Sequence, residues 1–361
     1  MDIRSNDGCV DALIENATLT NSSSTGALII GFDSEALDTL KTAAICSAFL
    51  SICGSSFVIM TYHLMRVHKP LVLSLLYWLS VTDLISSLVY IIDGLSANAD
   101  LMSCEPFTFC VFKAMLHQTF NLAAMLWTGS IALNLHLGLV LQAKIARQPA
   151  KFLRRLHICI WSFAPSVSLL LLLNGSYGRA GWCWIREHKA WQRFVCYYFP
   201  MLLVLGYNAV VYFLTQKTLL AMKTAANNSS ESSIELTSSH AVQGLARRMR
   251  LLLVIFVLVH TCSIINRLYD FFSPDQPSFF FSLLQSLSAP LQGLGNAIVY
   301  GFGSSRVRQT WGCNSDRCSC CDFFSWRRKA KNNVPSEVAA ATVLSEFESP
   351  TDSRRESIDP G

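Results

Sequence analysis

The sequence predicts an all-α membrane protein, a bundle of seven transmembrane helices. Three observations predict it: seven long apolar stretches, a charged share of only 15% in a chain that is 52% hydrophobic, and loops whose charge alternates from one side to the other. A soluble domain usually carries about 25% charged residues. A helix of about 20 mainly apolar residues crosses the hydrocarbon core of a bilayer and satisfies its own backbone groups there.

The predicted spans follow one another with short connections. They are residues 42–65, 71–92, 110–141, 156–173, 194–214, 251–272 and 279–302. Residues 1–41 then form an outer segment, residues 42–302 the seven-helix domain, residues 303–312 a juxtamembrane stretch and residues 313–361 a cytoplasmic tail. Proline predicts kinks at Pro165, Pro200 and Pro290, because it lacks an N–H group and frees a backbone carbonyl.

Basic residues predict the orientation. They collect in the loops at residues 66–70, 142–155 and 215–250 and in the tail, whereas the loop up to Phe109 carries Asp100 and Glu105 and no base. Only the loop at 174–192 breaks the trend. Loops rich in Lys and Arg remain in the cytoplasm. We therefore expect the N-terminus outside and the tail inside, in a multi-pass protein of the plasma membrane.

The cytoplasmic side carries three further predicted features. Residues 304–311 can form a short amphipathic helix lying along the membrane, the alternative being an irregular exit from the seventh span. Residues 227–239 are rich in Ser and Thr and are predicted to be disordered. Ser357 follows Arg354 and Arg355 and is either a phosphorylation site or part of a solvated tail.

The 13 cysteines divide by compartment. Cys110 opens the third span and Cys183 lies in the outer loop after the fourth, so a disulfide between them would tie that loop as a lid over the third helix. Cys9 either pairs with Cys104 or stays unpaired. The cytoplasmic cluster is predicted to be palmitoylated rather than to bind zinc, because it lacks pair-to-pair Cys-x-x-Cys spacing. This cluster is Cys313, Cys318, Cys320 and Cys321.

Three asparagines on the predicted outer side match the glycosylation pattern: Asn16, Asn21 and Asn174.

Two ionisable residues inside the predicted spans are candidates for function. Asp83 is about 12 residues into the second span, roughly 18 Å along a helix, and must find a partner in the bundle. Asn296 and Asn134 are the candidates, in a switch between two packings or in a static hydrogen bond. Arg267, in the sixth span, receives an anionic group of a ligand, pairs with Asp270 or Asp93, or extends to the outer membrane interface.

Several motifs together resemble a known family. They are Gly-Trp-Cys-Trp-Ile at 181–185, Leu-Trp-Thr at 126–128, Ile-Asn-Arg-Leu at 265–268 and Asn-x-x-x-Tyr at 296–300. The chain resembles the cyclic-AMP-receptor-like (class E) G-protein-coupled receptors, and its plant-type members most closely. It lacks the Asp-Arg-Tyr and Cys-Trp-x-Pro motifs of rhodopsin-like receptors, so their activation lock does not transfer.

The resemblance implies a receptor with the Cys110–Cys183 disulfide. It also implies a small extracellular ligand and a heterotrimeric G protein, through its α subunit, as partners beside membrane lipid. Asn266, Arg267, Trp127 and Trp184 are the candidate ligand contacts.

The competing classes have less support. A seven-helix transporter or channel is the alternative, but the two halves show no repeat. The seventh span has no lysine for a retinal Schiff base. The spans show no catalytic carboxylate pair, the bases lack interleaved aromatic residues for nucleic acid, and no metal or cofactor is predicted.

Overall fold

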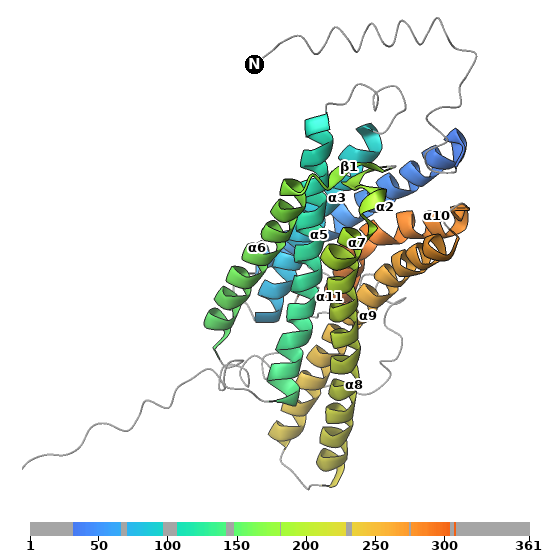
Figure 1. Ribbon diagram of the computed structural model, residues 1–361. Helices are drawn as coiled ribbons and strands as arrows, with labels where there is room; N and C mark the ends of the chain where they lie inside the picture. Colours follow the sequence, from blue (N-terminus) through green and yellow to red (C-terminus); the bar gives the residue numbers. More distant parts are fainter. Residues whose placement is uncertain are drawn as a thin grey trace, which may run out of the picture.

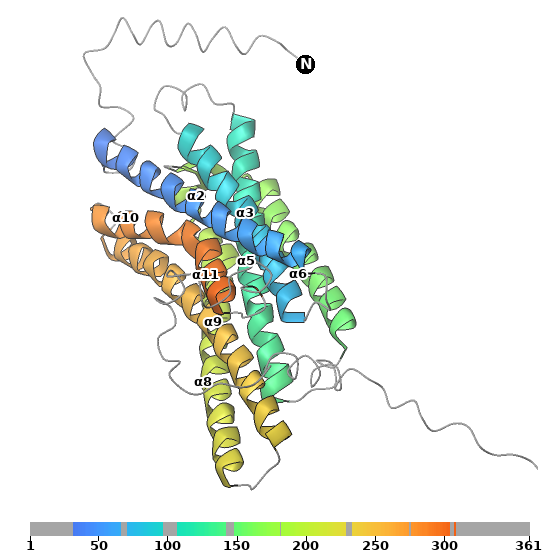
Figure 2. The same cartoon turned by 180° about the vertical axis from the view of Figure 1, so that it is seen from behind.

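The structure is a computed structural model that describes residues 32–65, 71–96, 107–141, 148–180, 182–228, 233–273, 276–303 and 307. It is a bundle of long helices with one short β-hairpin near an end (Figure 1). Seen from behind, α2 crosses α3 and lies beside α10 and α11 (Figure 2). The juxtamembrane helix, the tail and the N-terminal segment up to residue 31 lie outside the described residues, except for Val307.

Six long helices confirm the first six predicted spans. They are α2 (Ser34–Leu64), α3 (Leu71–Ser96), α5 (Phe107–Leu135), α6 (Pro149–Leu173), α8 (Phe199–Asn228) and α9 (Ser233–Phe272). Within the described residues, six helices are long and apolar enough to cross a membrane. Large apolar side chains such as Phe213 and Leu258 remain 70% and 63% exposed, as expected for a surface that faces lipid.

Two helices begin earlier than predicted because the sequence supplies start signals before the apolar stretch. Asp33 caps α2, with its carboxylate accepting a hydrogen bond from the Ala36 amide at 2.8 Å. Pro149 occupies the first turn of α6, where its missing N–H costs nothing. Both helices therefore extend past the hydrocarbon core on one side.

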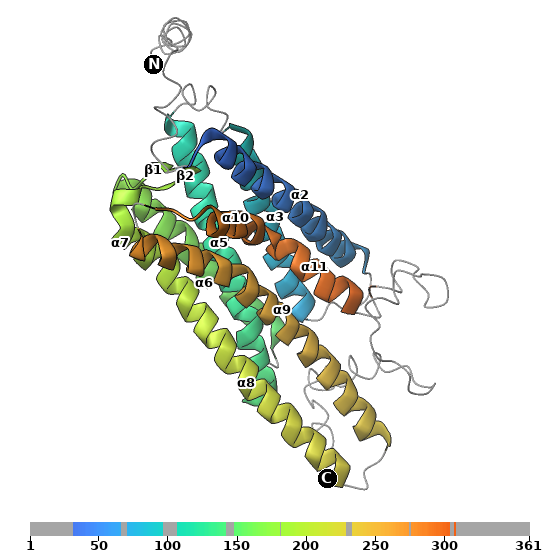
Figure 3. The ribbon, with the colours of Figure 1, turned by 90° about the vertical axis from the view of Figure 1, so that its right-hand side faces the viewer.

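The prediction that residues 227–239 are disordered was wrong for most of that stretch. Helix α8 runs to Asn228 and α9 begins at Ser233, with only residues 229–232 outside the described part. Once a helix is nucleated in the bundle, each added residue contributes a hydrogen bond, so propagation overrides a weak local preference. The two helices project together beyond the rest of the bundle (Figure 3).

The third and fifth spans each contain a π-helical turn. The first, η2 (His136–Val140), follows α5, and the second, η5 (Phe194–Tyr198), precedes α8. The 3-10 turn η4 (Glu187–Lys189) and the short helix α7 (Ala190–Arg193) lead into η5. Pro200 stands just after η5, where a kink was predicted, whereas α6 continues through Pro165.

The seventh span, predicted as one helix, is divided into two. Helix α10 (Phe279–Ser288) and helix α11 (Gln292–Gly303) are separated by the 3-10 turn η6 (Ala289–Leu291), which contains Pro290. Proline removes a helix donor and its ring clashes with the preceding turn, so the break falls at the predicted kink.

The hairpin consists of β1 (Tyr177–Ala180) and β2 (Trp182–Ile185), which pair antiparallel with Gly178 opposite Trp184. We call residues 177–185 the outer hairpin. It packs mainly on α5, and its Tyr177, Cys183, Trp184 and Ile185 form a small apolar cluster with Cys110. The segment predicted as a lid is therefore an ordered, buried part of the bundle.

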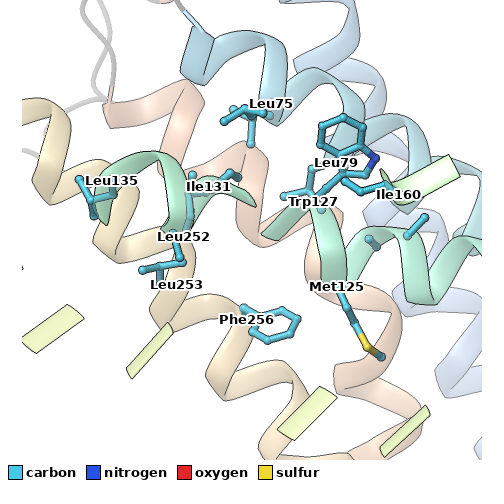
Figure 4. Packing of buried hydrophobic residues seen from close by; sticks show 14 of the residues in the cluster. Leu75, Leu79, Met125, Trp127, Ile131, Leu135, Ile160, Leu252, Leu253 and Phe256 are labelled. Atoms are coloured by element: carbon cyan, nitrogen blue, oxygen red, sulfur yellow. The ribbon is translucent and has the colours of Figure 1, made fainter. Parts of the chain in front are cut away.

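The main core lies between α3, α5, α6 and α9. Trp127 is fully buried there, beside Leu79 and Ile160, and Phe256 fills the side toward α9 (Figure 4).

Candidate functional site

A small polar cavity lies in the middle of the bundle. Its lining comes from α3, α5, η5, α9 and the break in the seventh span: Asp83, Ser86, Ser87, Tyr90, Asn121, Ala124, Tyr197, Val259, His260, Ser263, Ala289, Pro290 and Gln292. The centre of a water molecule has about 20 Å³ in which to move, and about 10–15 Å³ is enough to hold one water. In this packing the cavity suits one or two waters rather than an organic ligand.

Asp83 closes the inner end of the cavity. Its carboxylate accepts a hydrogen bond from Asn296 Nδ2 at 2.9 Å, and the residue is only 5% exposed. Gln292, one turn before Asn296, donates to Thr128 Oγ1 at 3.4 Å. The seventh span is thus joined to α3 and α5 by polar side chains just below its break, and of the two predicted candidates it is Asn296 that bonds to Asp83.

His260 lines the cavity, and its ring is oriented by its own helix. Its Nδ1 lies 3.0 Å from the carbonyl of Phe256, and its ring lies over the Phe256 ring at 4.1 Å. A carbonyl only accepts, so Nδ1 must carry the proton. In the neutral ring Nε2 is then an acceptor.

The outer hairpin is fastened to the bundle at three points. A disulfide joins Cys110 to Cys183, as predicted. The Tyr177 hydroxyl donates to the Ser168 carbonyl of α6 at 3.1 Å, and burial raises the pKa of this hydroxyl, which favours the protonated donor. The indole of Trp184 donates to Gln118 Oε1 of α5 at 3.0 Å.

Two ion pairs at the outer ends of the helices involve residues within the predicted spans or beside the candidate ligand contacts. Lys113 Nζ lies 2.9 Å from Asp93 Oδ1, with side chains only 4% and 11% exposed. Arg267 donates to Asp270 at 2.9 Å, and these side chains are 25% and 28% exposed. Of the two carboxylates considered for Arg267, the structure therefore pairs it with Asp270.

None of the four candidate ligand contacts lines the cavity. Asn266 donates to Gln285 of α10 at 2.7 Å, and Trp184 packs against Tyr197 with ring centres 5.2 Å apart. Trp127 stacks on Trp78 at 6.3 Å and meets His157 edge-on at 4.9 Å. Trp127 therefore faces α3 and α6 in the core, and its role as a ligand contact stays a prediction.

Sequence reasoning missed three residues of this region. Lys113 is a basic residue inside the predicted third span, three residues after Cys110. It could have been identified from the sequence as a buried charge that needs a partner. Gln118 and His260 are neutral polar residues among several on their helices, and their partners lie 66 or more residues away or on the helix backbone. Within the described residues, no cluster of three or more acidic, His or Cys side chains stands ready to hold a metal.

A hydrogen bond joins the inner halves of the third and fifth spans. His136 Nδ1, at the start of η2, lies 3.0 Å from the hydroxyl of Tyr207 on α8. Nearby, the guanidinium of Arg250 on α9 lies over the Tyr212 ring at 5.8 Å. These contacts lie toward the cytoplasmic end of the third span, which lacks the Asp-Arg-Tyr triplet of rhodopsin-like receptors.

Several predicted modification sites cannot be compared with the structure. Asn16, Asn21, Cys9, Cys104, Ser357 and the cysteines at 313, 318, 320 and 321 lie outside the described residues. Asn174 is exposed at the end of α6, and its carbonyl accepts from Lys189 at 3.0 Å.

Comparison with solved structures supports the fold. The structure of squid rhodopsin superposes with a TM-score of 0.62 over 89% of this chain and 94% of that one, at 14% identity. At that identity the likeness concerns the fold alone. The seven-helix reading therefore holds although the seventh helix is broken.

Sequence comparison gives relatives of similar length. "G-protein coupled receptor 1" of Arabidopsis thaliana is 26% identical over 285 residues, which cover 78% of this chain and 82% of the relative. "Cyclic AMP receptor-like protein A" of Dictyostelium discoideum is 24% identical, over 89% of this chain and 79% of the relative. The family model described as "Slime mold cyclic AMP receptor" matches residues 33–289, from the cap of α2 to the break in the seventh span. The chain belongs to the slime mold cyclic AMP receptor family.

Proposed function

We propose that this receptor binds a small anionic ligand at its outer end and passes the signal to the α subunit of a heterotrimeric G protein inside the cell. The coarser statement follows from the family: the chain is a multi-pass, G-protein-coupled-receptor-like protein. Membership of a receptor family favours a non-enzymatic role and does not favour a transporter. We place the receptor in the plasma membrane.

The Arg267–Asp270 pair is the observation that carries the ligand proposal. A guanidinium binds phosphate or carboxylate as a fork. Both side chains are about a quarter exposed, so an anion from solvent can replace Asp270 without stranding a buried charge. Arg267 also lies one helical turn from Ser263, which lines the cavity. The family description names cyclic AMP, itself an anion, and we carry over the anionic class only.

The Asp83–Asn296 bond is the proposed switch. A ligand changes a receptor only by favouring one of two packings. This bond holds α11 to α3 directly beside the cavity and the break in the seventh span, so a shift of α11 must break it or carry α3 along. The His136–Tyr207 bond would then report the change between the inner end of the third span and α8.

Nucleotide exchange on a reconstituted G-protein α subunit tests the function. The full chain in lipid nanodiscs is mixed with α subunits, and exchange is measured with cyclic AMP and then with a panel of organic phosphates and carboxylates. Stimulated exchange supports the receptor role. Absence of exchange throughout, together with flux of a panel compound into liposomes, would point to the transporter instead.

Removing the Arg267 cation is expected to weaken the response to the active anion. In Arg267→Ala the half-maximal concentration should rise at least about tenfold, because a hydrogen bond to a charged group contributes about 1.5–3 kcal/mol. Asp270→Asn keeps the cation and should retain the response.

Lys189→Ala is the matched control, since this outer base bonds to the Asn174 carbonyl away from the cavity. Surface expression is measured for every variant. A loss of expression in Arg267→Ala, with an unchanged half-maximal concentration in the surviving receptor, would reduce Arg267 to a structural ion pair.

The predicted modifications remain part of the proposal. Glycans on Asn16, Asn21 and Asn174 would mark the outer side, and palmitoylation of the juxtamembrane cysteines with phosphorylation of Ser357 would regulate the inner side.

A further inference from the structure

Gln118 on α5 connects three segments at the outer end of the bundle. The side chain is fully buried. Its Nε2 donates to the carbonyl of Cys196 in η5 at 3.0 Å, and its Oε1 accepts from the Trp184 indole of β2, also at 3.0 Å. One amide thus connects the third span, the outer hairpin and the start of the fifth span.

The chemistry of the two partners fixes the orientation of this amide. A backbone carbonyl only accepts and an indole N–H only donates. If the amide were flipped, two donors would face each other on one side and two acceptors on the other. Gln118 therefore has one productive arrangement, and it needs both partners in place.

Pro200 explains why the Cys196 carbonyl takes a side-chain donor. In an α-helix this carbonyl would accept from the amide of residue 200, four positions on. Residue 200 is proline and has no N–H. The chain forms the π-turn η5 directly before Pro200, and Gln118 supplies a donor that the proline cannot.

The contacts of Gln118 with Cys196 and Trp184 also shape the cavity. Tyr197, next to Cys196, lines the cavity, and the Trp184 ring packs edge-on against it at 5.2 Å. The Arg193 guanidinium lies over the Trp184 ring at 5.3 Å and donates through Nε to the Ile185 carbonyl at 2.8 Å. Gln118 adds to these contacts a link that ties both the hairpin and η5 to α5.

We infer that Gln118 is a positioning residue: it holds η5 in its π-helical turn against the outer hairpin and thereby sets the outer wall of the cavity. Cys110 fastens the hairpin to α5 covalently, and Gln118 adds a second fastening about 12 Å further along the helix axis. Of these two fastenings, only the Gln118 hydrogen bonds also reach the fifth span. The positioning role of Gln118 is argued from these contacts, and its effect on the ligand response rests on the proposed function.

The test follows the Trp184 indole N–H resonance in ¹⁵N-labelled full-length receptor, assigned by its loss in Trp184→Phe. Gln118→Met keeps the side-chain length and removes both hydrogen bonds. Its Trp184 resonance should move upfield, and amides of residues 194–201 should exchange with solvent about five- to tenfold faster. Gln216→Met is the matched control, because Gln216 bonds only to Tyr212 on its own helix and should leave both readouts unchanged.

Pro200→Ala separates positioning from simple packing. Alanine restores the N–H at residue 200, so the Cys196 carbonyl regains a helical donor. Gln118→Met should then lower the melting temperature less in the Pro200→Ala background than in the wild type. Equal losses in both backgrounds, or an unmoved Trp184 resonance, would overturn the inference.

Should Gln118→Met fail to fold, Trp184→Phe provides the second variant. It frees Gln118 Oε1 while keeping an aromatic ring against Tyr197, and it should speed exchange in residues 194–201. Unchanged exchange there would count against the inference. These readouts need no G protein, so failure of the proposed function is seen separately.

Discussion

Gly54→Ala is expected to prevent normal assembly of the bundle. Helices α2 and α11 are in close backbone contact at this glycine, where a Cβ atom would lie 2.7 Å from Leu294 Cα and 2.8 Å from the Gly293 carbonyl oxygen. Both are backbone atoms, so no side chain can rotate away. The helices must separate, and overpacking of this kind costs about 1–3 kcal/mol or more.

The displacement also reaches the polar core. Helix α11 carries Asn296, whose 2.9 Å bond to Asp83 allows little movement. Yield of monodisperse receptor by size-exclusion chromatography and thermal melting in detergent measure the effect. Gly206→Ala on α8 is the control, because a Cβ there meets nothing within 4 Å and alanine favours a helix. Equal melting of the two variants would show that α2 and α11 do not meet at Gly54.

Neutralising either Lys113 or Asp93 alone is expected to reduce the stability of the receptor strongly. Both side chains are almost fully buried, Lys113 Nζ also donates to Ser96 Oγ at 2.6 Å, and the ammonium lies 5.3 Å from the Phe109 ring centre. Removing one partner of a buried pair leaves the other charge uncompensated, which costs about 3–5 kcal/mol. Lys113→Met and Asp93→Leu should each reduce the melting temperature and surface expression sharply.

The double variant Lys113→Met/Asp93→Leu should recover most of that loss, because it strands no charge. Asp38→Asn provides the contrast: the Asp38–Lys41 pair spans one turn of α2, Asp38 is 70% exposed, and its loss should matter little. Additive damage in the double variant would mean that Lys113 and Asp93 act on different partners. Thermal melting of all four variants in one detergent decides between the two outcomes.

The sequence predicted the features that follow from one helix or one residue type. The spans followed from apolar length, and the break in the seventh followed from Pro290. The need of Asp83 for a partner followed from its charge, and Asn296 was one of two candidates. In these cases the physical requirement can be stated before any packing is known.

Features that depend on the rotation of one helix against another could not be predicted. Arg267 had two carboxylates within plausible reach, and only packing shows that Asp93 faces Lys113 instead. Likewise, only packing shows that α5 turns Trp127 toward α3 and α6. Gln118 gave no signal, because its partners are a carbonyl and an indole far along the chain.

Because α9 is long, a small tilt near the cavity produces a large displacement at its cytoplasmic end. Its 40 residues span about 60 Å, roughly twice the thickness of the hydrocarbon core. From His260, at the cavity, to its first residue at Ser233 the arm is about 40 Å long, so a tilt of about 5° at the cavity would carry the inner end about 3.5 Å. A cavity that holds only a water or two can thus govern a displacement on the scale of a side chain at the cytoplasmic end, with α8 alongside as the second arm.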